Sequence, residues 1–360
     1  MKDLATQSKA FNTKHNANIQ LQNHTLKMTH EEWISLRSNG LGGSEVAALL
    51  GLSKYDSKLS LWMKKTGRRG ETESTEQMRV GNVFEEAIAK EFEARYGWTI
   101  RRLNYIYSHP QHPWTRCNVD YIVQNPDTGN WGILEIKNPS EYARGDWITN
   151  FVVNEETGKI RPPKEYGTIP PQYHAQGQFY AGCAGLSFVI TCAMIGGFTL
   201  VPVYRSIDTE LFSALIEEGG NFWTNHVVDD KRPALEPLLE SSRKAIAEIL
   251  GEEAIEGDVL EITEGSELHN LFVMHLEAKE AEKSCKETKD GLAATILETI
   301  GQDHAKVTFG GKSAASWSKG RVTKKVDQDL LKLEYPEAYE KVVKITTGKP
   351  TLGIRFKPLK

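Results

Sequence analysis

The sequence predicts an α/β protein, in which a central mixed β-sheet is flanked by helices and followed by an appended C-terminal region. Residues 117–138 form a predicted β-hairpin, and helical patterns lie before it at 77–96 and after it from Pro171. Two further strand-like runs, 186–191 and 199–204, complete the predicted sheet. At 360 residues, the chain is long enough for such a core plus a second region.

Composition argues against an exported or membrane-spanning protein. The N-terminus lacks the apolar segment of a signal peptide, and no run of about 18 apolar residues is present. The cysteines are widely separated and form no CxxC or Cys/His ligand spacing, which indicates reduced thiols: Cys117, Cys183, Cys192 and Cys285. We therefore expect a cytoplasmic protein.

Charge is distributed unevenly along the chain. The formal net charge is -4, which argues against a wholly electrostatic coat for DNA. Residues 231–300 are acidic, whereas residues 301–360 are basic. A modestly acidic core is compatible with DNA binding if basic residues line the binding channel locally.

The N-terminal region predicts an arm followed by a helix. Residues 1–28 are rich in Asn, Gln, Lys and Thr and have few apolar residues, so we expect a flexible arm. Thr29 and Glu32 have the spacing of a capping box, which predicts the start of a helix.

A candidate anion site follows this helix. Ser44 comes after two glycines and before an apolar run, a pattern that predicts the N-cap of a second helix. The N–H groups of that helix start, together with the guanidinium of Arg37, are suited to a phosphate. A simple capped helix with a solvated arginine is the alternative.

The predicted helix 77–96 carries a candidate metal ligand. Glu85 lies one step from the core-facing stripe and can reach the hairpin, whereas Glu86 is expected in solvent. Apolar residues recur along this stripe at near-helical spacing: Val80, Phe84, Ile88 and Phe92.

The predicted hairpin 117–138 carries ionisable residues where an ordinary strand is apolar. Asp120 lies in the first strand, and Glu135 and Lys137 share one face of the second. Two carboxylates from neighbouring strands are costly to bury unless a cation neutralises them, and Mg²⁺ prefers such oxygen ligands. Lys137 would then orient an attacking water and stabilise charge developing on a phosphate. An ordinary surface Glu/Lys pair is the alternative.

The helix that begins at Pro171 has a polar face. Tyr173, Gln176 and Tyr180 lie on one side of it. The neutral amide of Gln176 is suited to positioning a phosphate or a water beside a metal, and a structural amide that joins two elements is the alternative.

The C-terminal third has a different pattern. Helices within 235–250 and 268–300 predict an antiparallel hairpin in region 231–302, a geometry suited to assembly or partner contact. Residues 303–360 predict a small basic α+β region with a helical patch near 328–342.

Several motifs together resemble a known family of nucleases. Asp120 followed by Glu135-Ile136-Lys137 resembles the D…(D/E)xK core of the restriction-endonuclease-like nucleases. The flanking segments resemble the other motifs of the group: Arg37 with Gly42-Gly43-Ser44-Glu45, Gly81 and Glu85 as GxxxE, and Tyr173, Gln176 and Gln178 as YxxQxQ. In this order, over residues 31 to about 225, they resemble the YqaJ-type viral recombinases, the family of bacteriophage lambda exonuclease.

The resemblance implies a nuclease site within a restriction-endonuclease-like core, residues 29–230. Two Mg²⁺ ions, with Mn²⁺ as a substitute, would be held by Glu85, Asp120, Glu135 and the Ile136 carbonyl. Asp120, Glu135, Lys137 and Gln176 would be catalytic, and Arg37, Ser44 and Tyr173 would bind DNA, with Arg37 and Ser44 at its 5′-terminal phosphate.

The resemblance also implies a substrate and partners. The substrate would be linear double-stranded DNA, digested from the 5′ end to leave a 3′ single strand for phage recombination. That strand would pass to a single-strand annealing protein of the RecT or Redβ kind. A ring-shaped homo-oligomer, a trimer in the reference case, would act in the cytoplasm of a bacterial host from a phage or prophage gene. A related endonuclease or repair nuclease, or a non-catalytic DNA-end-binding assembly factor, are the alternatives.

Overall fold

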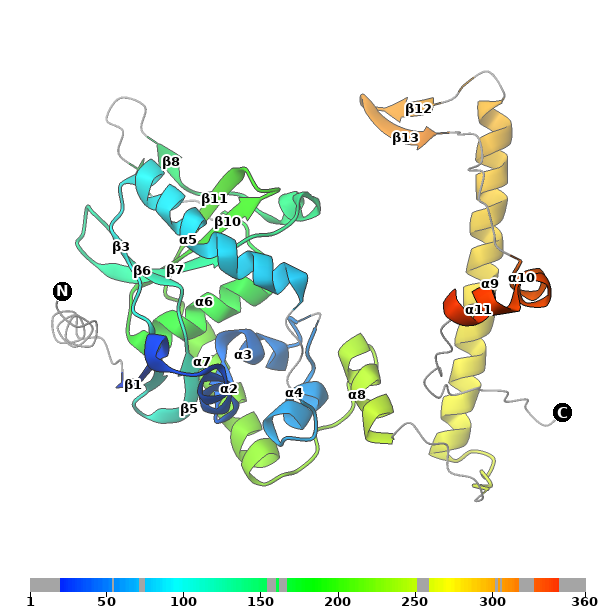
Figure 1. The fold of residues 1–360 in the computed structure, drawn as a ribbon, viewed down its shortest axis with the longest axis horizontal. Coiled ribbons are helices and arrows are strands. Elements are labelled where there is room, and N and C mark those ends of the chain that lie inside the picture. The colour runs from blue at the N-terminus through cyan, green and yellow to red at the C-terminus, as the bar shows by residue number, and fades with distance from the viewer. Residues whose placement is uncertain are drawn as a thin grey trace. The chain divides into compact units, whose positions relative to one another are not determined.

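The computed structural model describes residues 20–53, 55–70, 75–153, 160–161, 167–250, 259–301, 304, 306–316 and 327–342. Contacts divide the chain into a first unit, Met1–Leu250, and a second unit, Gly251–Lys360. Figure 1 labels the elements of both units. Among the described residues, no helix is both long and apolar enough to cross a bilayer.

A five-stranded mixed sheet lies at the centre of the first unit, in the order β11-β10-β7-β6-β3. Strand β7 is parallel to β10, whereas the other neighbouring pairs are antiparallel. The predicted mixed sheet is therefore confirmed, and so is its hairpin, which β6 and β7 form. The strands are β3 (Ile100–Arg101), β6 (Tyr121–Gln124), β7 (Trp131–Lys137), β10 (Phe188–Ile195) and β11 (Thr199–Ser206).

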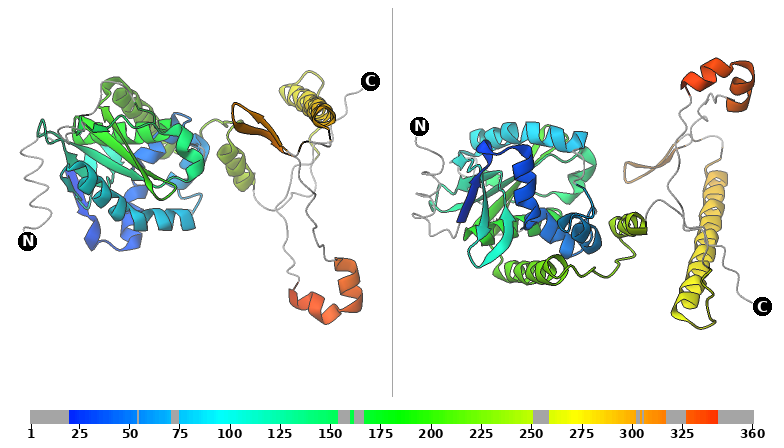
Figure 2. Two further views of the ribbon diagram at one scale, coloured as in Figure 1. Left: turned by 90° about the horizontal axis from the view of Figure 1, so that it is seen from above. Right: turned by 60° about the horizontal axis from the view of Figure 1, so that its bottom comes forward.

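Helices α5 (Glu76–Tyr96) and α6 (Pro171–Ala184) cover opposite faces of this sheet (Figure 2). Leu134 of β7 joins the apolar cluster that contains Phe92 of α5, and Ile133 joins the cluster that contains Phe179 of α6. Side chains alternate along a strand, so Glu135 shares the α6 face with Ile133. The predicted arrangement of a mixed sheet flanked by helices is confirmed.

Local sequence signals set the ends of both helices. The Thr75 side chain accepts the amide of Met78 and so caps α5, which ends at Gly97 with a φ of 68°. Helix α6 has Pro171 in its first turn, where proline costs no hydrogen bond, and ends at Gly185 with a φ of 66°. These signals hold the polar face of α6 in place over β7.

A smaller sheet in the first unit has the order β1-β4-β5-β2. Its strands are β1 (Gln20–His24), β2 (Leu41–Gly42), β4 (Tyr105–His109) and β5 (His112–Cys117). Strand β1 pairs with β4, and the short helix η1 (Thr25–Lys27) follows it. The prediction of an arm over 1–28 is therefore wrong for residues 20–27, because backbone pairing holds them to the core. Residues 1–19 lie outside the described part of the chain.

The remaining helices of the first unit pack around these sheets. The predicted capping box is confirmed at the start of α2, where the amides of Glu32 and Thr29 each donate to the other's side chain. The helices are α2 (His30–Ser38), α3 (Gly43–Leu49), α4 (Lys58–Lys65), α7 (Thr209–Phe222) with the π-helical turn η3 (Trp223–Val228), and α8 (Glu240–Leu250).

The described residues between β7 and α6 form few regular elements. It contains the 3₁₀ helix η2 (Glu141–Asp146) and the short antiparallel pair β8 (Val152–Val153) and β9 (Ile160–Arg161). A bridge between Ile148 and Thr168 closes the segment at its base.

Helix α8 belongs to the first unit, although the sequence pattern predicted it as part of the helical region 231–302. It contacts α4 and buries Ser241, Ser242 and Ala245. The compact unit therefore extends to Leu250 rather than ending at residue 230.

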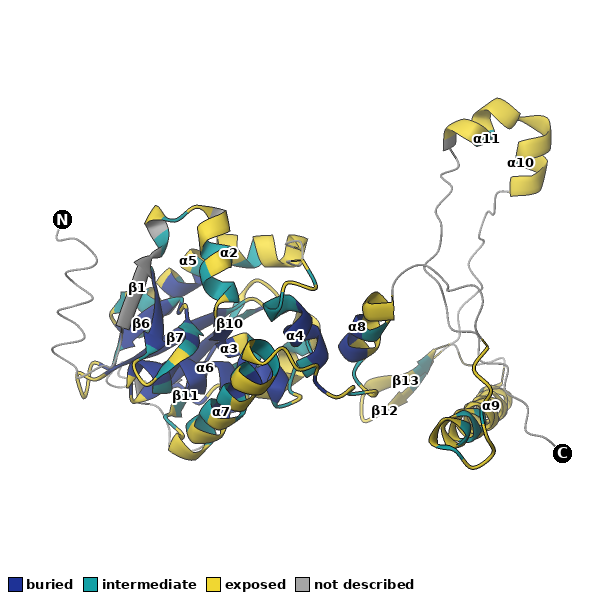
Figure 3. Ribbon diagram, turned by 90° about the horizontal axis from the view of Figure 1, so that it is seen from below, coloured by how far each residue is buried: buried dark blue, intermediate teal, exposed yellow. Residues whose placement is uncertain are grey.

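The second unit consists of one long helix and smaller elements. The predicted helix over 268–300 is confirmed as α9 (Glu267–Ile300), which has no buried residue. Strands β12 (Lys306–Phe309) and β13 (Lys312–Ser316) form a hairpin, and α10 (Gln328–Glu334) and α11 (Pro336–Val342) lie in the predicted helical patch. Figure 3 shows α9, α10 and α11 largely exposed, in contrast to the buried β6, β7, β10 and α6.

Candidate active site

Glu135 lies at the centre of a buried polar cluster between β7 and α6. Its side chain is 3% exposed. Its Oε1 accepts hydrogen bonds from Lys137 Nζ at 2.7 Å and from Gln176 Nε2 at 2.7 Å. Lys137 Nζ also donates to Gln176 Oε1 at 3.2 Å. The structure thus brings together three of the predicted catalytic residues.

The other oxygen of Glu135, Oε2, is buried and accepts no hydrogen bond from the described residues. Leaving a buried acceptor unsatisfied costs about 1–3 kcal/mol, and more when it carries charge. Most buried polar atoms in folded proteins have a partner, and a cation is suited to supply one at this position.

Asp120 is anchored to the same strand. Its Oδ2 accepts the backbone amide of Ile136 at 2.8 Å. Burial raises the pKa of Asp120, and the nearby Lys137 acts in the opposite direction. The hydrogen bond places Asp120 beside the backbone amide of Ile136, the residue after Glu135, and does not involve the Ile136 carbonyl that is the predicted ligand.

Glu85 of α5 interacts electrostatically with Asp120 and Lys137. Burial raises its pKa to about 7, and repulsion by Asp120 adds to the shift. Burial and Asp120 likewise raise the pKa of Glu135 to about 7. Three carboxyl groups from α5, β7 and the residue before β6 therefore influence one another's ionisation, as they would around a shared cation.

Arg102 is a residue of the candidate site that the sequence motifs did not reveal. Its guanidinium forms an ion pair with Glu85 and lies over the ring of Tyr121, 5.4 Å from its centroid. The pairing of β3 with β6 places Arg101 opposite Ile122, and so brings Arg102 beside Tyr121. Predicting which strand pairs with residues 100–101 would have revealed it.

The donor set fits a hard divalent cation, although the ligands are not gathered around one point. Carboxylate oxygens are the ligands that Mg²⁺ and Mn²⁺ prefer. Over the described ranges, no three acidic, His or Cys side chains form a ready metal cluster. One oxygen of Glu85 accepts from Arg102, and Asp120 accepts the Ile136 amide.

The predicted anion site differs from its expected form. The N-cap of α3 is Gly42, so the prediction that Ser44 caps this helix is wrong. The carboxylate of Glu45 accepts the Gly42 amide at 2.8 Å and closes the helix start. Because Glu45 already occupies that position, a phosphate would have to bind the Arg37 guanidinium, which lies over the Trp33 ring at 4.6 Å.

Helix α3 packs directly on α6 at Tyr180 and at Gln176, and Gln176 in turn contacts Glu135. A Cβ atom added to Gly43 would lie 2.8 Å from Tyr180 Cε1 and 3.0 Å from Gln176 Cγ. Only glycine permits this approach without displacing the neighbours. The connection from α2 to α3, residues 37–45, forms the Arg37 corner. The packing of Gly43 on Gln176 holds this corner next to the Glu135 cluster.

Tyr173 and Gln178, the other two residues of the YxxQxQ motif, form no hydrogen bond with Glu135 in the described part of the chain. Lys137 Nζ lies 4.9 Å from the ring centroid of Tyr173, a cation–π contact that helps to fix the lysine. Gln178 is fully buried and joins α6 to the start of α7, because its side chain bonds to the Ser206 carbonyl and the Asp208 amide. Of the two glutamines in the predicted motif, only Gln176 reaches Glu135.

Comparison with known proteins identifies this segment. A family model, the YqaJ-like viral recombinase domain, matches residues 32–187. The resemblance predicted from the motifs is confirmed: this segment is YqaJ-like. The YqaJ-like segment contains Arg37, Glu85, Asp120, Glu135, Lys137 and Gln176.

The wider chain also has relatives. It is 29% identical to the protein YqaJ of Bacillus subtilis over 326 residues, which cover 89% of this chain and 92% of that protein. The fold is similar to an alkaline exonuclease, LHK-Exo, of Laribacter hongkongensis, with a TM-score of 0.41, 18% identity, and coverage of 61% of this chain and 99% of that one. The shutoff and exonuclease protein of Kaposi's sarcoma-associated herpesvirus has a TM-score of 0.31 at 12% identity, covering 57% and 71% of the two chains.

Proposed function

We propose that the first unit is a metal-dependent deoxyribonuclease that digests linear double-stranded DNA from its 5′ end. The observation that carries this proposal is the unpartnered Oε2 of Glu135, a buried carboxylate whose other oxygen accepts from Lys137 and whose pKa is raised by burial and by the charge of Asp120. The match of this segment to a viral recombinase domain supports DNA as the substrate.

Glu85, Asp120, Glu135 and the Ile136 carbonyl are the proposed ligands of one or two Mg²⁺ or Mn²⁺ ions. When bound, such ions supply Lewis acidity and an activated water. Lys137 Nζ, held by Glu135 and Gln176, would donate to the phosphate oxygen at which negative charge develops. Gln176 fixes both partners without adding charge.

Arg37 is the proposed contact for the 5′-terminal phosphate. Its guanidinium pairs with no carboxylate among the described residues, and the packing of Gly43 on Gln176 holds its corner next to the Glu135 cluster. Ser44 retains a place in the proposal only as a hydroxyl in the first turn of α3. Tyr173 contributes by fixing Lys137.

The wider role follows from the proposed polarity. Digestion from the 5′ end leaves a 3′ single strand, which a single-strand annealing protein of the RecT or Redβ kind would use in phage recombination. A ring-shaped homo-oligomer, with a trimer as the first candidate, would keep the enzyme on its DNA. A bacterial cytoplasm is the compartment that this role requires.

The test uses linear duplex DNA labelled at one 5′ end, a covalently closed circle and a Lys137→Ala variant. Early release of labelled mononucleotide from the linear DNA, dependent on Mg²⁺ and lost in Lys137→Ala, is the expected result. Cutting of the circle would identify an endonuclease instead. Binding of DNA ends without cleavage in Mg²⁺ or Mn²⁺ would identify a non-catalytic assembly factor.

A further inference from the structure

Lys65 is a buried cation that the proposed chemistry does not use. Its side chain is 4% exposed and lies at the last residue of α4. Its Nζ forms an ion pair with Glu45 Oε1 at 2.9 Å and donates to the backbone carbonyl of Arg37 at 3.1 Å. One ammonium group therefore joins the end of α2 to the start of α3.

Glu45 and Arg37 share the corner that Lys65 supports. A Cβ atom added to Gly42 would lie 3.6 Å from Glu45 Oε2 and 3.7 Å from Arg37 Nη2. These opposite charges are close, yet no ion pair joins them in the described structure. Glu45 is instead satisfied by the Gly42 amide and by Lys65.

The ion pair between Lys65 and Glu45 affects the charge around Arg37. The Glu45 side chain is only 17% exposed, so its charge requires a partner. Without Lys65, the Arg37 guanidinium would be a cation left near Glu45 at Gly42, and pairing with Glu45 would occupy the donors that a phosphate needs. An unneutralised Glu45 would also repel the phosphate directly.

We propose that Lys65 is a positioning residue for recognition of the 5′-terminal phosphate. It neutralises Glu45 and holds the Arg37 backbone, so that the guanidinium remains free for the phosphate. This inference rests on the proposed function, in which Arg37 contacts the 5′ end of the DNA.

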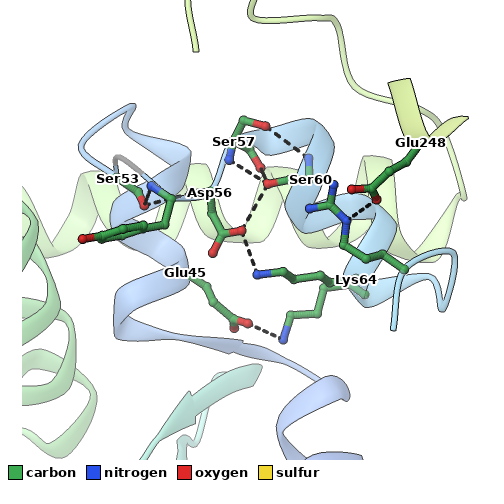
Figure 4. A network of polar contacts seen from close by, with 10 residues as sticks. Glu45, Ser53, Asp56, Ser57, Ser60, Lys64 and Glu248 are labelled. Carbon is green, nitrogen blue, oxygen red and sulfur yellow. Dashed lines mark hydrogen bonds and ion pairs between the residues drawn. The ribbon is translucent and has the colours of Figure 1, made fainter. Parts of the chain in front are cut away.

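The neighbouring lysine provides a matched control. Lys64, also in the last turn of α4, pairs with Asp56 at 2.7 Å. Figure 4 shows Lys64 directed to Asp56, while Glu45 is joined to the other lysine side chain by a separate dashed line. Asp56 also accepts the Ser60 hydroxyl, so this second pair belongs to the local structure of α4. Both lysines form a short ion pair on one helix end, but only Lys65 contacts the Arg37 corner.

The test compares binding of duplexes that carry a 5′-phosphate or a 5′-hydroxyl, measured by fluorescence anisotropy in EDTA so that metal-dependent cleavage does not occur. We expect the wild-type protein to prefer the phosphate by roughly tenfold or more, and Arg37→Ala to abolish that preference. Lys65→Met should lose most of it, and Lys64→Met should keep it. The double variant Lys65→Met/Glu45→Gln should recover it, because the competing carboxylate is gone. Thermal melting establishes that each variant is folded.

Each result is decisive. Unchanged preference in Lys65→Met, no preference in the wild type, or a double variant no better than Lys65→Met would overturn the positioning role. Cleavage in Mg²⁺ is measured separately on the same proteins. A phosphate preference that depends on Lys65, without any cleavage, would support the positioning role of Lys65 and reject the nuclease. Cleavage together with a phosphate preference that does not depend on Lys65 would support the nuclease and reject the positioning role.

Discussion

Gln176 of α6 donates a hydrogen bond to Glu135 of β7 at 2.7 Å, and so joins helix and strand at the most buried carboxylate of the candidate site. The contact is made inside the core, where Gln176 is 8% exposed and Glu135 is 3% exposed. Water competes weakly for a hydrogen bond at such depth, so the amide defines where the carboxylate points. The remaining oxygen, Oε2, accepts no hydrogen bond from the described residues, and it is the atom that we propose binds a cation.

The two glutamines of α6 should separate activity from stability. Gln176→Ala removes an outer partner of a proposed ligand, so we expect cleavage by the folded protein to fall by about 10–100-fold. Gln178→Ala removes the partners of Ser206 and Asp208, so we expect a loss of about 1–3 kcal/mol in unfolding free energy with normal activity of the folded protein. Rate assays and denaturant melts on both variants measure this. Equal effects of the two substitutions on rate would contradict the assignment.

Glu85 and Glu86 should differ sharply although they are adjacent. Glu85 lies beside Asp120 and Arg102, whereas Glu86 pairs with Lys90 at 2.5 Å in solvent. Glu85→Gln should weaken binding of Mn²⁺ and reduce cleavage, because a proposed ligand loses its charge. Glu86→Gln should leave both unchanged, since an exposed helix pair contributes little. A loss of activity in Glu86→Gln, with none in Glu85→Gln, would identify Glu86 as the metal ligand in place of Glu85.

The metal-free protein should lose stability as pH rises. Burial raises the pKa of both Glu85 and Glu135 from 4.5 to about 7, so between these values the folded state binds more protons than the unfolded chain. Its unfolding free energy therefore falls through this window. Mn²⁺ binds the ionised form, so the gain in melting temperature on adding it should be larger above pH 7 than near pH 5. Melting curves across the window, with Glu135→Gln as the flattened control, measure this. A metal-free melting temperature that rises with pH would contradict it.

Most of the site was predictable because its residues are close in sequence or fall on regular elements. Alternation along one strand places Glu135 and Lys137 on the same face, and the hairpin brings Asp120 beside them. The period of α6 then directs Gln176 to that face. These relations need only the geometry of a strand and a helix.

The parts that were missed depend on pairing between distant segments. Arg102 reaches Glu85 because β3 pairs with β6, and strand pairing is not encoded in the local pattern. Residues 20–24 form β1 because β4 offers a free edge, although their composition is that of an arm. Ser44 was expected to cap α3, but the carboxylate of Glu45 reaches back to Gly42 and moves the helix start. In each case a long-range or competing contact decided the outcome.

We propose that Glu135 Oε2 binds a divalent cation. Titration of Mn²⁺ into the wild-type protein and Glu135→Gln, followed by isothermal calorimetry, tests it most directly. We predict binding by the wild type, and a loss in Glu135→Gln that exceeds the about 10–100-fold typical of outer-shell partners, with the fold intact in a melting control. Equal affinity in the two proteins, or no binding by the wild type, would contradict the claim.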